Sequence, residues 1–156
     1  SIVPPPVFEL PNLQILAAFG NELTALPAQI HNLTRLRFLN LSNNQLRTLP
    51  PEVGDLTGLT DLRLTHNDLE TLPAEAGGLV SVTLMHLTHN RLTVLPPEMG
   101  YWTSMTELSV ASNRLQALPI ELGLLTILSR LDMEHNAISV PPAEVVARGP
   151  ADVVDF

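Results

Sequence analysis

Apolar residues recur along this chain in a phrase that returns every 23 residues. Six segments share the order apolar-x-x-apolar-x-apolar-x-x-Asn-x-apolar, and no insertion interrupts their spacing. The segments begin at Leu13, Leu36, Leu59, Val82, Met105 and Leu128. A fixed period of about 20 to 50 residues is typical of solenoids, in which each repeat is one structural unit stacked on the next. The sequence therefore predicts a single solenoid domain.

The centre of each phrase alternates polar and apolar residues, as in Asp61-Leu62-Arg63-Leu64. A period of two predicts a short strand whose leucines point inward. One unit cannot bury its leucines alone, so successive strands must stack about 4.8 Å apart into a parallel sheet. Each phrase ends on a turn that carries an asparagine, whose amide can bond backbone groups of the neighbouring turn. We therefore expect a ladder of asparagines at positions 21, 44, 67, 90, 113 and 136.

A second phrase lies between the strands and has the form Leu-Pro-x-Glu-apolar-Gly, as in residues 49–54 and 95–100. Proline fixes φ and has no N–H to donate, which favours an extended path into this segment. With proline early and glycine at its end, the segment predicts a single helical turn. Trp102 falls in the column that leucine occupies in other repeats, so we expect it in the core and the preceding Tyr101 at the surface.

These two phrases resemble the leucine-rich-repeat superfamily over residues 3–147. The 23-residue unit is similar to that of the Ras-group, scribble-like and erbin-like intracellular proteins. The resemblance implies an α/β repeat solenoid: a right-handed horseshoe with a parallel β-sheet on its concave face and short helical or extended segments on its convex face. It also implies that the concave face binds a protein partner and that the chain is a cytoplasmic or membrane-proximal signalling scaffold.

The repeat pattern divides the chain into three parts. Residues 1–12 are interpreted as a partial N-terminal repeat, residues 13–139 as six 23-residue repeats, and residues 140–156 as a truncated C-terminal capping segment. Uncapped leucines at a solenoid end lower solubility. We therefore expect this chain to be a piece of a longer protein, with its N-terminal end contacting further repeats or another subunit.

Residues that alternate with the core leucines should face outward from the sheet and differ between repeats. Eleven of these form the predicted protein-binding surface: Phe38, Asn40, Asp61, Arg63, His66, Leu84, His86, His89, Glu107, Arg130 and Asp132. Exposed aromatic and arginine side chains are good interface anchors. Ile15 and Phe19 either belong to this surface or are covered by a further N-terminal part. The acidic end, which includes Glu134, either attracts a basic segment of the partner or is a solvated rim.

Three histidines fall close together in the predicted stack. His66 and His89 occupy equivalent positions in adjacent repeats, and His86 points the same way. Three imidazoles can bind zinc, but no cysteine or carboxylate completes the ligand set locally. Solvated surface histidines are the favoured interpretation, and a pH-sensitive interface is a further one. We predict no metal site.

Composition narrows the function. The formal net charge of −8 disfavours nucleic acid and anionic membrane surfaces as partners. The absence of cysteine favours a reducing compartment, here the cytoplasm. No run of residues reaches transmembrane length, so direct membrane insertion is not expected. The chain has no zinc-protease, phosphate-loop or nucleophile-elbow motif, so we predict neither an enzyme nor a cofactor.

The resulting hypothesis is a non-catalytic protein-interaction module, a scaffold or adaptor. Two alternatives stay open at this point. In the first, the chain would be the targeting domain of a larger signalling enzyme, such as a Roco-type kinase-GTPase or a ubiquitin ligase. In the second, it would be a structural subunit of a large assembly. Repeat folds host many functions, so the step from fold to scaffold rests on analogy.

Overall fold

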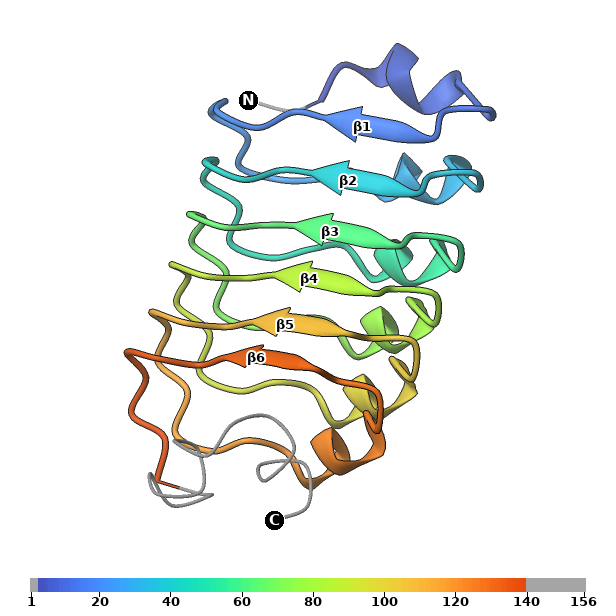
Figure 1. Cartoon of the computed structure of the whole chain (residues 1–156). Helices are drawn as coiled ribbons and strands as arrows, with labels where there is room; N and C mark the ends of the chain where they lie inside the picture. The colour runs from blue at the N-terminus through green and yellow to red at the C-terminus, as the bar shows by residue number, and fades with distance from the viewer. Residues whose placement is uncertain (1–2, 140–156) are drawn as a thin grey trace.

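The computed structural model describes residues 3–139 of the chain. Each repeat contributes one three-residue strand and one five-residue 3-10 helix, joined by turns and extended segments (Figure 1). The strands are β1 (Ile15–Ala17), β2 (Phe38–Asn40), β3 (Asp61–Arg63), β4 (Leu84–His86), β5 (Glu107–Ser109) and β6 (Arg130–Asp132). The helices are η1 (Pro5–Glu9), η2 (Ala28–Asn32), η3 (Pro51–Asp55), η4 (Ala74–Gly78), η5 (Pro97–Tyr101) and η6 (Ile120–Leu124).

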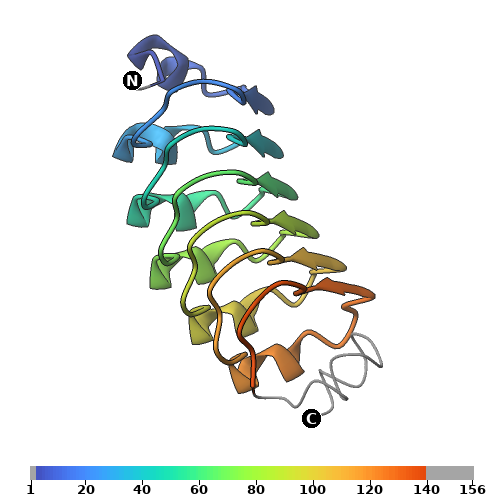
Figure 2. The same ribbon diagram turned by 90° about the vertical axis from the view of Figure 1, so that its left-hand side faces the viewer.

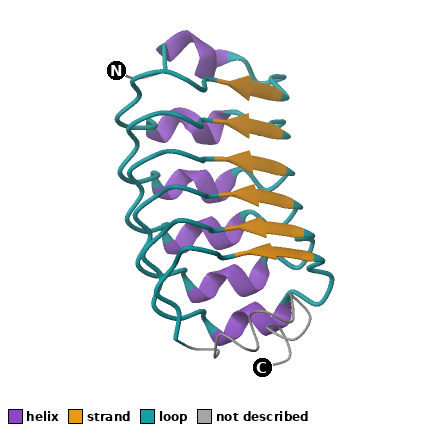
Figure 3. Cartoon of the chain, turned by 60° about the vertical axis from the view of Figure 1, so that its left-hand side comes forward, coloured by secondary structure: helices purple, strands orange, loops and turns teal. Residues whose placement is uncertain are grey.

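The strands form one parallel sheet in the order β1-β2-β3-β4-β5-β6. Each residue pairs with the residue 23 positions later, as Leu39 does with Leu62, which confirms the predicted period. The sheet is open and lies on one side of the stack, with the helices on the other (Figure 3). The strands lie closer together than the bulkier helices, so the stack bends with the sheet on its concave side (Figure 2). The predicted solenoid architecture is therefore confirmed.

The core runs unbroken between the sheet and the helices. Leucines of the strand phrase, such as Leu39 and Leu62, meet residues of the helical phrase, such as Val53 and Leu56, and all are almost completely buried. Trp102 is fully buried, as predicted, and its indole Nε1 donates to the carbonyl oxygen of Ala76 at 2.8 Å. Each inner repeat buries its leucines against two neighbours, so the end repeats of the described stack are the least enclosed.

The asparagine ladder is present from Asn44 onward, where each asparagine links its turn to the one before it, whereas the hydrogen bonds of Asn21 within residues 3–139 stay in its own turn. The Oδ1 atom of Asn67 accepts from the Leu46 N–H at 3.0 Å, and its Nδ2 donates to the carbonyl oxygens of Leu41 and Leu64 at 3.0 Å. Asn44, Asn90, Asn113 and Asn136 repeat this arrangement. Each amide thus satisfies three backbone groups that would otherwise be costly orphans.

A second ladder of hydroxyl groups was not predicted. The Oγ1 atoms of Thr60, Thr83 and Thr106 each donate to the carbonyl oxygen 23 residues earlier, at 2.9, 3.0 and 3.1 Å. These threonines precede the strands, where the chain enters the sheet. A sequence signal existed, because the three threonines and Ser129 share one column of the repeat.

The helical segments pack closely on one another along the convex side. Proline stands immediately before each of η2 to η6, and the predicted helical turn takes the tighter 3-10 form. Glycine is required at Gly54 of η3, because a Cβ there would overlap the carbonyl oxygen of Glu75 in η4, whereas η2 has His31 at the equivalent position. The close approach of η3 and η4 therefore depends on backbone contact.

The N-terminal residues form a helical segment like the others, η1, which packs on η2 and buries Val3 and Phe8. The division into a partial repeat, six full repeats and a cap stays a prediction. Residues 140–156, for which the sequence predicts the cap, lie outside the described residues.

Candidate binding surface on the sheet

The outer face of the sheet carries nine of the eleven residues predicted for binding. In β2 to β5 the middle residue is buried, while the first and third face outward. The parallel register aligns the outward residues in two rows. One row is Ile15, Phe38, Asp61, Leu84, Glu107 and Arg130, and the other is Ala17, Asn40, Arg63, His86, Ser109 and Asp132. The remaining two residues, His66 and His89, lie in the turns after β3 and β4.

Phe38, Asp61 and Arg63 form a compact cluster on β2 and β3. The Arg63 guanidinium donates from Nε to Asp61 Oδ1 at 3.1 Å and from Nη2 to Asp61 Oδ2 at 2.9 Å. Its Cζ atom lies 5.1 Å from the centroid of the Phe38 ring, within cation–π range. The hydrogen bond to Asp61 raises the pKa of Arg63 above its ordinary value, so the guanidinium stays charged across the physiological range.

Phe38 and Leu84 are less exposed than the sequence predicts. Both are partly buried, whereas Ile15 and Phe19 at the N-terminal end are 64% and 58% exposed. For Phe38 the reason is the arginine that stacks on its ring. Ile15 lies on β1, which has a strand neighbour on one side only. The apolar part of this face is therefore most open at its N-terminal end.

Glu107 connects β4, β5 and β6 electrostatically. Its Oε1 lies 3.3 Å from His86 Nε2 and 3.6 Å from Arg130 Nη1. The geometry at His86 is not that of a hydrogen bond, and its buried Nε2 has no hydrogen-bond partner within the described residues. A buried polar atom without a hydrogen-bond partner is costly, so His86 carries an unsatisfied group in this part of the face.

Hydroxyl groups that the sequence did not single out complete the surface. Thr88 Oγ1 and Ser109 Oγ lie 2.6 Å apart, and Ser109 Oγ donates to Asp132 Oδ2 at 3.3 Å. Asn40 Oδ1 accepts from the Ser42 N–H at 3.0 Å, which closes a local turn. The C-terminal part of the face is thus polar and acidic, while the N-terminal part is apolar.

His66 and His89 stack face to face, with ring centroids 4.3 Å apart and planes inclined by 10°. The predicted proximity is confirmed, but His86 faces Glu107 rather than this pair. Within residues 3–139, no group of three or more His, Asp or Glu side chains could hold a metal ion. The stacked pair is an exposed aromatic feature of the turns.

The turn that carries these histidines requires a positive φ, which the sequence analysis did not predict. His66 and His89 have φ values of 56° and 55°, in the left-handed region. The same column holds Gly20, Asn43, Ser112 and His135, all with positive φ. Glycine and asparagine enter this region most readily, and β-branched residues are excluded from it. The backbone therefore limits which residues can vary here.

No helix of residues 3–139 is long and apolar enough to span a bilayer.

In the same part of the chain, the four ion pairs lie on the sheet face or on the turns beside it: Arg63–Asp61, His86–Glu107, Arg91–Asp68 and Arg130–Glu107. What the surface offers chemically is a preformed set of aromatic, cationic and carboxylate groups.

Comparison with known proteins identifies the architecture. A family profile described as a leucine-rich repeat region matches residues 3–139. A solved leucine-rich-repeat protein of Leptospira interrogans has a TM-score of 0.88 at 31% identity, over 97% of this chain and 38% of that chain. A solved TDR receptor has a TM-score of 0.79 at 29% identity, over 85% of this chain and 24% of that chain.

A third similar structure is the ectodomain of the plant membrane receptor kinase GASSHO1/SCHENGEN3 from Arabidopsis thaliana, solved in complex with Casparian strip integrity factor 2. Its TM-score is 0.67 at 31% identity, over 93% of this chain and 21% of that chain. This chain therefore spans less than two fifths of the length of each of these three proteins. No curated protein sequence matches it.

Proposed function

Because this chain belongs to the leucine-rich-repeat family, we propose that it is a non-catalytic module that holds a partner protein on its concave sheet face. Domains of this family are typically binding modules, and the Arabidopsis ectodomain was solved with a bound factor. A solenoid keeps its leucines constant for stacking while its outward residues vary, which leaves those residues free for recognition.

The observation that carries this proposal is the cluster of Phe38, Asp61 and Arg63. An aromatic ring and an arginine are held together on the surface before any partner arrives, because Asp61 fixes the guanidinium with two hydrogen bonds. Prearranged side chains lose less conformational entropy when a partner binds. Aromatic and arginine residues are also the commonest energetic anchors of interfaces.

The partner is proposed to carry a basic segment toward the C-terminal end of the face. Within residues 3–139, Asp132 accepts only from Ser109 Oγ and from the Glu134 N–H, at 3.3 Å each. Neither Asp132 nor Glu134 has an ion-pair partner among the described residues. Arg130 is engaged with Glu107 instead. Two carboxylates without a cation favour a positively charged group of the partner.

The test is affinity capture with the chain and with a Phe38→Ala, Arg63→Glu, His86→Glu variant, followed by mass spectrometry of the bound proteins. We expect the variant to lose a specific partner while its circular dichroism spectrum stays that of the parent. A matched control is Arg35→Glu with Gln45→Ala, which changes exposed residues away from the two outward rows. An identical set of bound proteins for parent and triple variant would refute recognition by this face.

The finer class of the protein is also a proposal. The 23-residue unit and its Leu-Pro-x-Glu phrase favour the intracellular, scribble-like class, and the absence of cysteine favours the cytoplasm. Fractionation of cells that express the tagged natural protein would test this location. Recovery in the secreted fraction would contradict it.

A role inside a larger protein or assembly is the second candidate. The observation that favours it is the exposed apolar group at the N-terminal end, where Leu10, Ile15 and Phe19 are 49%, 64% and 58% exposed. Further repeats or another subunit would cover these side chains. The test is light scattering across a concentration series, in which self-association that Ile15→Thr with Phe19→Ser abolishes would support an interface at this end. A monomer at every concentration would argue against self-assembly through it.

A further inference from the structure

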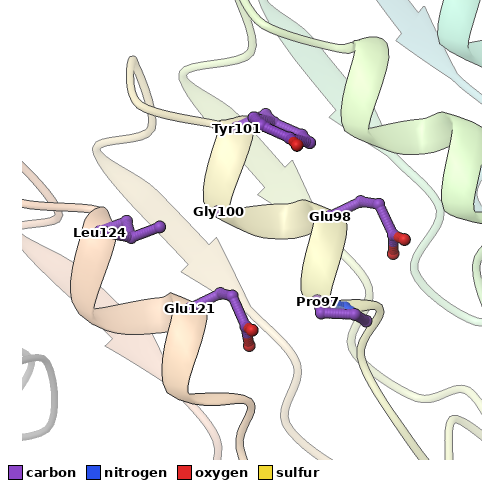
Figure 4. A pocket seen from close by; sticks show the side chains of 6 residues that line it. All are labelled: Pro97, Glu98, Gly100, Tyr101, Glu121 and Leu124. Carbon is purple, nitrogen blue, oxygen red and sulfur yellow. The ribbon is translucent and has the colours of Figure 1, made fainter.

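Two grooves on the convex side occupy equivalent places in the repeat. The η3–η4 groove is lined by Pro51, Glu52, Gly54, Asp55, Glu75 and Gly78. The η5–η6 groove is lined by Pro97, Glu98, Gly100, Tyr101, Glu121 and Leu124 (Figure 4). Each residue of the second groove lies 46 positions, or two 23-residue repeats, after its counterpart in the first. The groove itself therefore comes from the stacking of the helices, and its chemistry comes from the side chains.

The two grooves differ in the residues that end each helix. In the η3–η4 groove these are Asp55 and Gly78, and in the η5–η6 groove they are Tyr101 and Leu124. Tyr101 is 66% exposed and Leu124 is 58% exposed, so neither contributes its full area to the core. Because the repeat accepts aspartate, glycine and, at Asn32, asparagine in this column, stacking does not require apolar residues here. Exposed apolar side chains on neighbouring helices mark an interaction surface, here with the Tyr101 ring turned toward η4 and the Leu124 side chain turned toward η5 (Figure 4).

The η5–η6 groove also holds two carboxylates without a cation. Glu98 and Glu121 stand on neighbouring helices with their side chains turned the same way, each toward the preceding helix (Figure 4). Helices η3 to η6 contain no arginine, lysine or histidine. Neither carboxylate takes part in an ion pair within residues 3–139. A positively charged group that entered the groove would meet a field that nothing nearby neutralises.

We propose that the η5–η6 groove is a second docking surface, which takes a segment of a partner protein with an arginine or lysine beside an aliphatic side chain. The cation lies against Glu98 and Glu121, and the aliphatic group packs on Tyr101 and Leu124. The groove has a volume of about 240 Å³, which is less than most small-molecule pockets and suits one or two side chains. The surface lies on the opposite side of the stack from the sheet, so both faces can be occupied at once (Figure 2).

A second copy of this chain is a poorer occupant. The chain carries a net charge of −8, and two copies related by a two-fold axis at this groove would bring Glu98 and Glu121 against the same carboxylates. Like charges that are brought together and desolvated cost several kcal/mol in general. Charge complementarity therefore selects a basic partner.

The probe is the blocked tetrapeptide acetyl-Leu-Arg-Leu-Arg-amide, titrated into the 15N-labelled chain and followed by NMR. Its matched control peptide carries citrulline in place of arginine, which keeps the shape and removes the charge. We expect the arginine peptide to shift the amide signals of Gly100, Tyr101 and Leu124 in a saturable way. The citrulline peptide should bind at least about tenfold more weakly, which corresponds to about 1.4 kcal/mol.

The chain itself supplies conservative variants for this test. Tyr101→Asp with Leu124→Gly installs the residues of the η3–η4 groove, and Glu98→Gln with Glu121→Gln installs the residue found at Gln29 of η2. Each pair should weaken the arginine peptide by about tenfold or more. The control pair Glu52→Gln with Glu75→Gln, in the η3–η4 groove, should leave the affinity unchanged. Circular dichroism verifies that all variants stay folded.

Three outcomes would overturn the proposal. Equal shifts in both grooves would reduce it to attraction by any acidic surface. Loss of the peptide signal in the Phe38→Ala, Arg63→Glu variant would place the peptide on the sheet face. Shifts of Gly100 and Tyr101 that follow protein concentration without peptide would assign the groove to a second copy. Failure of the concave-face hypothesis would leave this result untouched, because the titration depends on no residue of the sheet.

Discussion

The η3–η4 and η5–η6 grooves are built from the same six repeat positions and differ in chemistry at two of them. Aspartate and glycine end the helices of the first groove, and tyrosine and leucine end those of the second. The glutamates and the prolines before them are identical in kind. The difference teaches that the repeat fixes where a groove lies, whereas one column of side chains decides what it can bind.

On the sheet face, too, the repeat fixes the positions and the side chains decide the chemistry, but here the charges are paired. There outward residues neutralise one another, within one strand for Asp61 and Arg63 and between neighbouring strands for Glu107 and Arg130. On the convex side the repeated glutamates have no such partners within the described residues. The sheet is thus prearranged by internal contacts, and the helical side keeps unneutralised charge.

An added methyl group should lower stability by different amounts at Gly54 and at Gly100, the glycines that line the two grooves. In Gly54→Ala the new Cβ would overlap the backbone carbonyl of Glu75, which cannot move without shifting η4. In Gly100→Ala it would lie 2.9 Å from Leu124 Cδ1, the end of a flexible side chain. We expect Gly54→Ala to lower the free energy of unfolding by about 3 kcal/mol and Gly100→Ala by about 1 kcal/mol. Urea denaturation measures both, and equal losses would mean that the two positions are equally constrained.

The asparagine ladder should be equally important beside either groove. Asn67→Ala removes three hydrogen bonds to backbone groups and Asn113→Ala removes four, with Leu46 N–H losing its acceptor in the first case and Leu92 N–H in the second. Each substitution should cost about 2 kcal/mol, because a buried donor is left unsatisfied. Thermal unfolding compares the two variants. A marked difference between them would show that the frames of the two repeats are not equivalent.

A tyrosine introduced into the η3–η4 groove should give that groove part of the peptide affinity of the η5–η6 groove. Asp55→Tyr places an aromatic ring on the η3–η4 groove at the position of Tyr101, and we expect acetyl-Leu-Arg-Leu-Arg-amide to gain a few-fold in affinity there, or roughly 0.5 to 1 kcal/mol. The free energy of unfolding should change by no more than about 0.5 kcal/mol, since Asp55 is exposed. NMR shifts of the Gly54 and Glu75 amides report the gain. Asp55→Asn, which adds no ring, is the control and should bind no better than the parent.

Paired and unpaired carboxylates should differ slightly in stability. Glu107→Gln removes a partner from His86 and Arg130, so we expect a loss of about 0.5 kcal/mol, a small value because Arg130 is largely exposed. Glu121→Gln removes a charge with no cation among the described residues, so stability should stay the same or rise slightly. Parallel urea titrations at low and high salt distinguish the two. A salt-independent loss in Glu121→Gln would contradict this assignment of charge.

The sequence alone determined the frame of this protein. The uninterrupted 23-residue spacing predicted the register that pairs Leu39 with Leu62, the asparagine ladder and the burial of Trp102. The reason is that stacked repeats translate a position in the sequence directly into a row in space. The same spacing aligned the outward columns, so the candidate surface could be located before the structure was known.

Tertiary structure decided how the side chains of different columns meet. Arg63 stacks on Phe38, His86 faces Glu107 and not the pair of His66 and His89, and Tyr101 borders a groove. The period does not specify these contacts, because they depend on rotamers and on how closely neighbouring helices approach. The positive φ at His66 and His89 likewise follows from the geometry of the turn. Repetition thus sets the position of each side chain, and packing between repeats sets its partners.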